Sequence, residues 1–194
     1  MEEKFEKIKQ EVEKELSCSA HNMDHIMRVY NLSLYLAKDE DVDLDVLKAS
    51  VLLHDIARVK EDDDSSGKID HAILGAEMAV PILRELDFTE EKTKHIQDCI
   101  VSHRYHGRTD NKPKTKEAEI LFDADKLDVV GAIGIARGFF WHGRNNKNVN
   151  IFEINIKLTI DRLYTEKAKE IAKERIEFHK NFLDRMRKEE NREL

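Results

Sequence analysis

Apolar residues recur at intervals of three and four positions through most of the chain, which is the spacing of one face of an α-helix. The first segment shows this clearly, because Phe5, Ile8, Val12 and Leu16 stand among charged residues. Few residues interrupt the pattern, since the 194 residues include only two prolines and seven glycines. The sequence therefore predicts an all-α fold, with residues 1–194 forming a single domain built as a helical bundle.

Capping residues and polar stretches divide this pattern into helices. Asp43 is placed to cap a helix that we expect to run to about Val59, and Asp70 and Thr89 are placed to cap the next two. Residues 60–67 and 105–116 lack periodicity and predict exposed loops. We expect residues 150–190 to form two helices that pack on a core of about residues 21–144.

Composition restricts the compartment and the partners. A formal net charge of −7 disfavours general nucleic-acid binding, although the basic residues of 105–116 are compatible with a small anionic ligand. The two cysteines make no disulfide framework, and neither a signal peptide nor a membrane-spanning run is visible. We therefore expect a cytoplasmic protein without a membrane partner, either a monomer or a homodimer.

A histidine and an aspartate stand side by side at the end of an apolar helical run, as His54 and Asp55. Both residue types bind metals. Neighbours on a helix point about 100° apart, so the two reach one ion only if it lies between them on the buried side, and such an ion needs further ligands. A buried pair without a metal, satisfied by hydrogen bonds, is the alternative.

Further candidate ligands come from two other segments. His25 lies one predicted helix upstream, and Asp123, Asp125 and Asp128 lie in an apolar segment, where a carboxylate needs a partner because burying it alone is costly. Asp125 has the most apolar setting of the three. Two imidazoles and two carboxylates suit several divalent metals without a strong preference.

These residues resemble the signature of the HD-domain superfamily of metal-dependent phosphohydrolases. The match extends to residues 24–29, 49–56, 71–77 and 123–137, which are similar to small, single-domain bacterial and archaeal HD hydrolases. That branch includes a manganese-dependent deoxynucleoside triphosphate pyrophosphohydrolase. The resemblance covers about residues 21–144 and implies an HD-type helical bundle.

The resemblance also implies a set of metal ligands, namely His25, His54, Asp55 and Asp125. In the family the ligand aspartate directly precedes a basic residue and a leucine, which selects Asp125. The implied cofactor is one divalent ion, Mn first, with Mg, Ni, Co, Fe or Zn as alternatives and a second ion as a further alternative. Asp24 either orients a metal-bound imidazole or is a surface acid that begins a helix.

His71 and His103 fall where binuclear HD phosphodiesterases place additional metal ligands. We prefer the interpretation that they line the substrate site, where they donate hydrogen bonds or a proton to the leaving group. The basic residues near the signature are candidates for binding phosphate oxygens: Arg58, Lys60, Arg104, Lys126 and Arg137.

The chain also departs from the family pattern. HD nucleotidases and guanosine-tetraphosphate hydrolases carry an acid shortly after the His-Asp pair, whereas this chain has residues 57–60 as Ala-Arg-Val-Lys. Residues 61–64 can supply an acid from the loop. We predict a metal-dependent phosphohydrolase that acts on a phosphate ester or anhydride, with a nucleotide as substrate in the manner of dNTP or NTP pyrophosphohydrolases. The alternatives are a binuclear HD phosphodiesterase and a non-catalytic, metal-dependent nucleotide-binding regulatory module.

Overall fold

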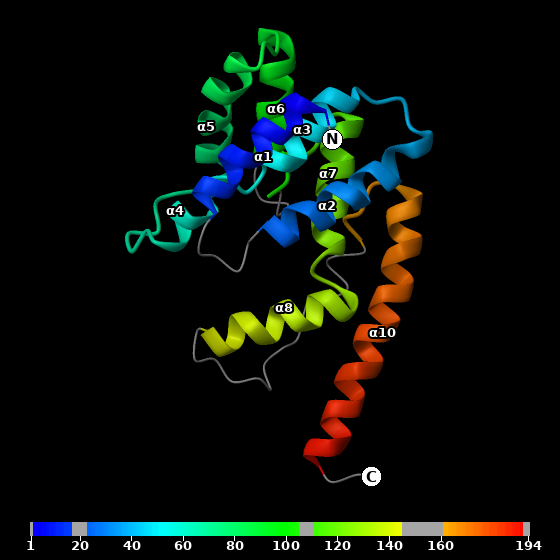
Figure 1. The fold of residues 1–194 in the computed structure, drawn as a ribbon. Helices are drawn as coiled ribbons and strands as arrows, with labels where there is room; N and C mark the ends of the chain where they lie inside the picture. The colour runs from blue at the N-terminus through cyan, green and yellow to red at the C-terminus, as the bar shows by residue number, and fades with distance from the viewer. Residues whose placement is uncertain (1, 17–22, 105–110, 145–160, 192–194) are drawn as a thin grey trace. The chain divides into compact units, whose positions relative to one another are not determined.

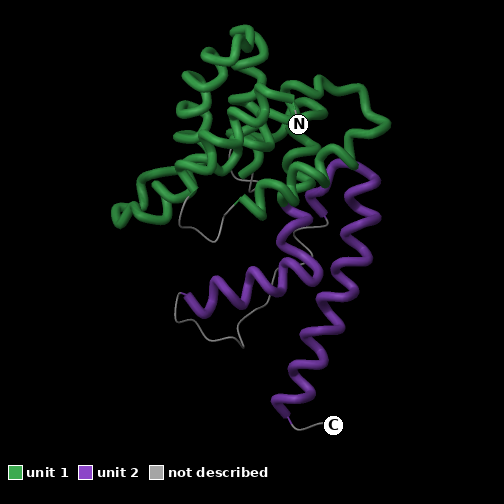
Figure 2. Tube along the Cα trace, in the orientation of Figure 1, with its two compact units in different colours: residues 1–125 green, residues 126–194 purple. Residues whose placement is uncertain are grey.

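The computed structural model describes residues 2–16, 23–104, 111–144 and 161–191. These residues form helices joined by turns, with no strand among them, and the predicted all-α fold is confirmed (Figure 1). The chain divides into two compact units, residues 1–125 and residues 126–194 (Figure 2). The assignment of residues 1–194 to a single domain stays a prediction.

The first unit is organised around one buried helix. It contains α1 (Glu3–Glu15), α2 (Met23–Leu36), the short 3-10 helix η1 (Ala37–Asp39), α3 (Leu44–Leu53), α4 (Arg58–Asp62), α5 (His71–Glu85), α6 (Glu90–Ser102) and most of α7 (Lys116–Leu127). Helix α3 packs against α1, α2, α5 and α6, and most of its residues are buried. A helix that is apolar nearly all round belongs in a core, which explains this central place.

The predicted caps position the helices that carry the candidate site. Asp43 Oδ1 accepts hydrogen bonds from the backbone N–H groups of Asp45 (2.9 Å) and Val46 (3.2 Å) at the start of α3. Asp70 caps α5 and Thr89 caps α6 in the same way, and these three caps are confirmed. His71 is the first residue of α5, and His54 and His103 directly follow the last residues of α3 and α6.

The predicted end of the third helix is wrong. Helix α3 stops at Leu53, and residues 54–57 form turns in which Ile56 N–H donates to the Leu53 carbonyl (3.1 Å) and Arg58 N–H to the Asp55 carbonyl (2.8 Å). This tighter backbone buries four consecutive side chains, from His54 to Ala57. His54 and Asp55 therefore lie in a turn after α3 and not within a regular helix.

The loop predicted for residues 60–67 is also partly wrong, because α4 extends to Asp62. Arg58 forms ion pairs with Glu61 (2.9 Å) and Asp62 (3.3 Å), three and four residues later, and such pairs stabilise a helical turn. The exposed loop begins only at Asp63. Of the loop expected at residues 105–116, residues 105–110 lie outside the described residues, and residues 111–115 lead into α7.

The second unit contains α8 (Gly131–Arg144) and α10 (Glu166–Glu190), which pack against each other. Helix α10 begins at the cap Thr165 and buries Ala168, Ala172 and Ile176, one side of an amphipathic helix. It corresponds to the second of the two expected C-terminal helices, while the first lies mainly outside the described residues. Among the described helices, none is long and apolar enough to cross a membrane.

Candidate metal centre

The first unit brings four predicted metal ligands together. His25 comes from the first turn of α2, His54 and Asp55 follow α3, and Asp125 lies near the end of α7. His25 Nε2 lies 3.4 Å from His54 Nε2, 3.4 Å from Asp125 Oδ1 and 3.6 Å from Asp55 Oδ2. His54 Nε2 lies 3.7 Å from the same Asp55 oxygen. Both histidines are fully buried, Asp55 is nearly so, and Asp125 is partly exposed.

The donor atoms of this group fit a divalent cation. His54 Nδ1 donates a hydrogen bond to the Val51 carbonyl (2.8 Å), so Nε2 of the neutral ring presents its lone pair to the group. Burial lowers the pKa of His54 to about 4, so the ring is neutral at pH 7. An ion about 2.1 Å from each ligand atom spaces neighbouring ligand atoms by about 3.0–3.4 Å, which is close to the observed spacing.

Asp55 is ionised in this setting. Burial raises the pKa of its carboxyl group, but the surrounding histidines outweigh burial and hold that pKa well below its usual value. The C-terminal end of α3 adds the negative end of a helix dipole beside it. A buried carboxylate beside the Nε2 lone pair of His54 is an electron-rich cluster, and these groups could hold a cation.

The second oxygen of Asp55 faces a second group. Oδ1 lies 3.2 Å from His71 Nε2 and 3.7 Å from His103 Nε2, and these two nitrogens are 3.2 Å apart. His103 is oriented as His54 is, since its Nδ1 donates to the Ile100 carbonyl (2.5 Å) at the end of α6. These three residues also form a group that can hold an ion. Asp55 therefore gives one oxygen to each of two adjacent groups.

Glu61 is a site residue that the sequence did not single out from its neighbours. Its Oε2 accepts from His71 Nδ1 (2.8 Å) and from Arg58 Nη1 (2.9 Å), and its Oε1 accepts from Arg104 Nη1. Burial raises the pKa of Glu61, but His71, Arg104 and Arg58 together lower it, so the side chain is a carboxylate. Helical spacing could have identified Glu61 from the sequence, because a helix over residues 58–62 places Arg58 and Glu61 on one face.

The five phosphate-binding candidates lie in different places. Arg58 and Arg104 meet at Glu61 and His71, whereas Lys60 forms an exposed ion pair with Glu15 of α1 (2.7 Å). Lys126 and Arg137 belong to the second unit. Their roles stay predictions, as does that of Asp24, which is exposed at the start of α2.

The other two aspartates of the α7 segment are buried as well. Arg137 donates to Asp128 Oδ2 (2.5 Å), so this carboxylate has a basic partner within the second unit. Asp123 is fully buried in α7. Asp125 contacts His25, with Oδ1 3.4 Å from Nε2, and its choice as the ligand stays a prediction.

The chain belongs to the HD domain family, whose model matches residues 22–130. This range contains both groups of candidate ligands. The predicted family and its all-α fold are confirmed, and the solved relatives include proteins described as HD-superfamily hydrolases.

Individual relatives match almost the whole chain. The uncharacterized protein YpgQ of Bacillus subtilis is 28% identical over 182 residues, which cover 88% of this chain and 85% of YpgQ. The crystal structure of YpgQ in complex with ADP has a TM-score of 0.75 at 26% identity and covers 95% of this chain and 97% of that one. An HD-superfamily hydrolase from Bacillus thuringiensis has a TM-score of 0.74 at 28% identity, with 97% of both chains covered.

Proposed function

We propose that this protein is a metal-dependent phosphohydrolase that cleaves a phosphate ester or anhydride of a nucleotide. The observation that carries this proposal is the group formed by His25, His54, Asp55 and Asp125, in which each ligand atom lies 3.4–3.7 Å from at least one other. Two carboxylates cancel the charge of a divalent ion, and mixed nitrogen and oxygen donors suit Mn²⁺ as the first choice. The complex of YpgQ with ADP supports a nucleotide as the substrate.

His25, His54, Asp55 and Asp125 would hold a divalent ion, which would supply a water molecule of lowered pKa and polarisation of a phosphoryl oxygen. The chain itself supplies orientation. The hydrogen bond from His54 Nδ1 to the Val51 carbonyl keeps Nε2 directed at the ligand group. Burial of both histidines excludes bulk water from the ligand atoms, which strengthens the electrostatic interactions there.

His71 is the residue that we propose for the leaving group. Its Nδ1 is held by Glu61 at 2.8 Å, which directs Nε2 toward Asp55 Oδ1 at 3.2 Å, beside the metal ligands. From this position His71 donates a hydrogen bond or a proton to the departing oxygen, with His103 lining the same side. Glu61 is therefore a positioning residue that acts through His71.

Arg58 and Arg104 are the proposed contacts to the substrate phosphate. Both guanidinium groups use Nη1 to contact Glu61, which keeps them at the edge of the site beside His71. A guanidinium has five N–H donors in a planar fork, so a phosphate can be bound by other donors of the same groups. Their contacts to Asp62 and Asp70 mean that phosphate binding replaces part of an existing ion-pair network.

An activity screen tests the proposed function. Deoxynucleoside and ribonucleoside triphosphates, monophosphates and cyclic dinucleotides are incubated with Mn, Mg, Co, Ni, Fe or Zn, and phosphate, pyrophosphate and nucleotide products are measured. We expect turnover that depends on the metal and is abolished by His54→Ala, whereas Asp41→Asn in an exposed loop leaves it unchanged. Saturable nucleotide binding without hydrolysis across the panel would overturn the enzyme and favour the regulatory module.

A two-metal centre is a second candidate, and the shared carboxylate favours it. One Asp55 oxygen faces each group, so the two groups could each hold an ion and share this carboxylate, and such a pair would supply stabilisation of the attacking and the leaving oxygen. Metal analysis after saturation distinguishes the candidates. Two ions per chain, reduced to one by His103→Ala, indicate the binuclear phosphodiesterase type, and one ion that survives this substitution indicates the mononuclear centre.

A further inference from the structure

A buried carboxylate at the start of α7 binds the start of α3. Glu117 is 6% exposed, and its Oε1 accepts a hydrogen bond from the backbone N–H of Asp43 (2.7 Å), the residue that caps α3. In a capping box, the third residue of the helix supplies the acceptor for this N–H group. The third residue of α3 is Val46, whose side chain has no polar atom. Glu117 of another helix therefore completes the cap of α3.

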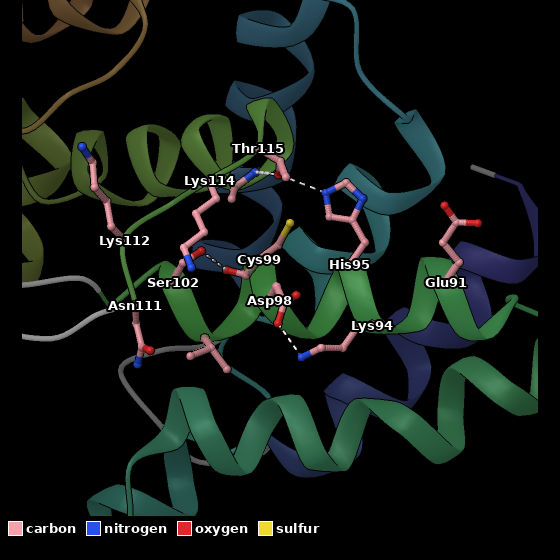
Figure 3. A pocket seen from close by; sticks show the side chains of 12 residues that line it. Glu91, Lys94, His95, Asp98, Cys99, Ser102, Asn111, Lys112, Lys114 and Thr115 are labelled. Carbon is pink, nitrogen blue, oxygen red and sulfur yellow. Dashed lines mark hydrogen bonds and ion pairs between the residues drawn. The ribbon is translucent and has the colours of Figure 1, made fainter.

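The second oxygen of Glu117 faces α6. Glu117 Oε2 lies 3.3 Å from His95 Nε2, and the same nitrogen lies 2.9 Å from Thr115 Oγ1. Figure 3 shows the His95 ring directed at Thr115, whose Oγ1 also accepts from the backbone N–H of Ala118 (3.3 Å) at the start of α7. Burying a carboxylate alone is costly, so these partners hold Glu117 in place. Glu117, Asp43 and His95 thus form a junction of three helices, the Glu117 junction.

The three helices of the Glu117 junction also meet at the candidate metal centre. With its caps included, each helix has one residue at the junction and one at the centre, namely Asp43 and His54 for α3, His95 and His103 for α6, and Glu117 and Asp125 for α7. At 1.5 Å per residue the three stretches are about 16, 12 and 12 Å long. They run in the same direction, from the junction to the centre.

The position of a ligand at one end of a helix depends on where the helix is held at the other end. Ligand atoms must be placed to within about 0.5 Å to bind a metal well. We propose that Glu117 is a positioning residue for the candidate metal centre. Its two contacts fix where α7 begins relative to α3 and α6, and it acts through Asp125, which α7 carries to the ligand group. This role rests on the proposed metal centre and not on the proposed hydrolysis.

Titration of the full chain with Mn²⁺, followed by electron paramagnetic resonance, tests this role without a substrate. Glu117→Ala removes both contacts and should weaken Mn²⁺ binding by about tenfold or more, as is usual for residues that support metal ligands. Glu117→Gln keeps an oxygen for the Asp43 N–H, so its affinity should stay within about twofold of the wild type. Glu117→Asp keeps the charge on a shorter side chain, so it should weaken binding too, and it replaces the alanine variant if that one does not fold.

Thr165→Ala is the matched control for loss of stability. Thr165 Oγ1 accepts from the Ala168 N–H (3.2 Å) at the start of α10 in the second unit, so this variant also removes a side-chain acceptor at a helix start. Melting temperatures in EDTA compare the stability that the variants lose. Thr165→Ala should be less stable than the wild type and bind Mn²⁺ as tightly.

Three results would overturn the role of Glu117. The first is wild-type Mn²⁺ affinity in Glu117→Asp and in Glu117→Ala where it folds. The second is binding in Glu117→Gln as weak as in the alanine variant, because charge and not the hydrogen bond would then matter. The third is equal weakening in Thr165→Ala, because lost stability would then explain the effect. A wild type that binds no Mn²⁺ would overturn the metal centre and this role with it, whereas the first three results leave the metal centre standing.

Discussion

Replacing Asp55 by asparagine tests the shared carboxylate directly, because the side chain keeps its shape and loses its charge. Oδ2 lies 3.6 Å from His25 Nε2 and Oδ1 lies 3.2 Å from His71 Nε2. An amide keeps an oxygen for one of these groups and presents an NH₂ group to the other. It also leaves the charge of a divalent ion less compensated, so one substitution weakens metal binding whichever group holds the ion.

The size of the effect follows from binding linkage. A metal that binds only the folded chain stabilises it by about 2.7 kcal/mol at 100 times its dissociation constant. For a chain of this size, about 1 kcal/mol corresponds to roughly 2–4 °C, so the wild type should melt about 5–11 °C higher with the metal than without it. If asparagine weakens the affinity about 100-fold, the same metal concentration stabilises Asp55→Asn by about 0.4 kcal/mol, or about 1 °C.

Differential scanning calorimetry with Mn²⁺ and with EDTA measures both shifts. The matched control is Asp41→Asn, which removes a carboxylate from an exposed loop and should keep the full shift of the wild type. A shift in Asp55→Asn as large as that of the wild type would show that Asp55 is not a ligand, and the assignment of both groups around it would fail.

Three further predictions concern other parts of the chain. Glu61→Gln should lower kcat about 10–100-fold with the metal still bound, because the carboxylate that holds His71 Nδ1 at 2.8 Å loses its charge. The Cys99 thiol should resist alkylation at pH 8 in a chain whose other cysteine is serine, since burial raises its pKa to about 12 and leaves about one thiolate in 10⁴. Gly131→Ala should destabilise the chain by about 1 kcal/mol or more in urea unfolding, because φ is +76° and the new Cβ would lie 3.0 Å from an arginine Cβ. Steady-state kinetics measure kcat of Glu61→Gln and dialysis measures its bound metal; an unchanged kcat would contradict the positioning role of Glu61. Equal labelling rates for Cys99 in buffer and in urea would contradict the protection of its thiol by burial. Gly143→Ala is the control for the third, since nothing lies within 4 Å of its added Cβ, and equal stabilities of the two variants would contradict the strain at Gly131.

The sequence predicted the parts of the molecule that depend on local signals. Asp43, Asp70 and Thr89 cap the helices that they were expected to cap, because an N-cap bonds to backbone only two or three residues away. His25, His54, Asp55 and Asp125 each stand in a short motif, and the structure places all four in the first unit. Their role as metal ligands stays a prediction.

What the sequence could not predict depends on partners that are distant along the chain. Glu61 meets Arg104, which is 43 residues away, and neither residue belongs to a recognisable motif. The end of α3 was misplaced because apolar residues continue through Ile56 and Ala57, and periodicity does not distinguish a buried helix from buried turns. In both cases tertiary packing decides the outcome.

His54 and His103, which follow α3 and α6, differ from His71 in the kind of group that fixes their tautomer. His54 and His103 each bond to the backbone carbonyl three residues earlier, and that carbonyl is present whatever side chain occupies its residue. Mutation of neighbouring side chains therefore leaves Nε2 of these two rings as the nitrogen that faces the candidate ligand groups. His71 depends on the carboxylate of Glu61, so a single codon change can alter it. Descendants of this chain can thus diverge in the chemistry around His71 while the orientation of His54 and His103 stays constant.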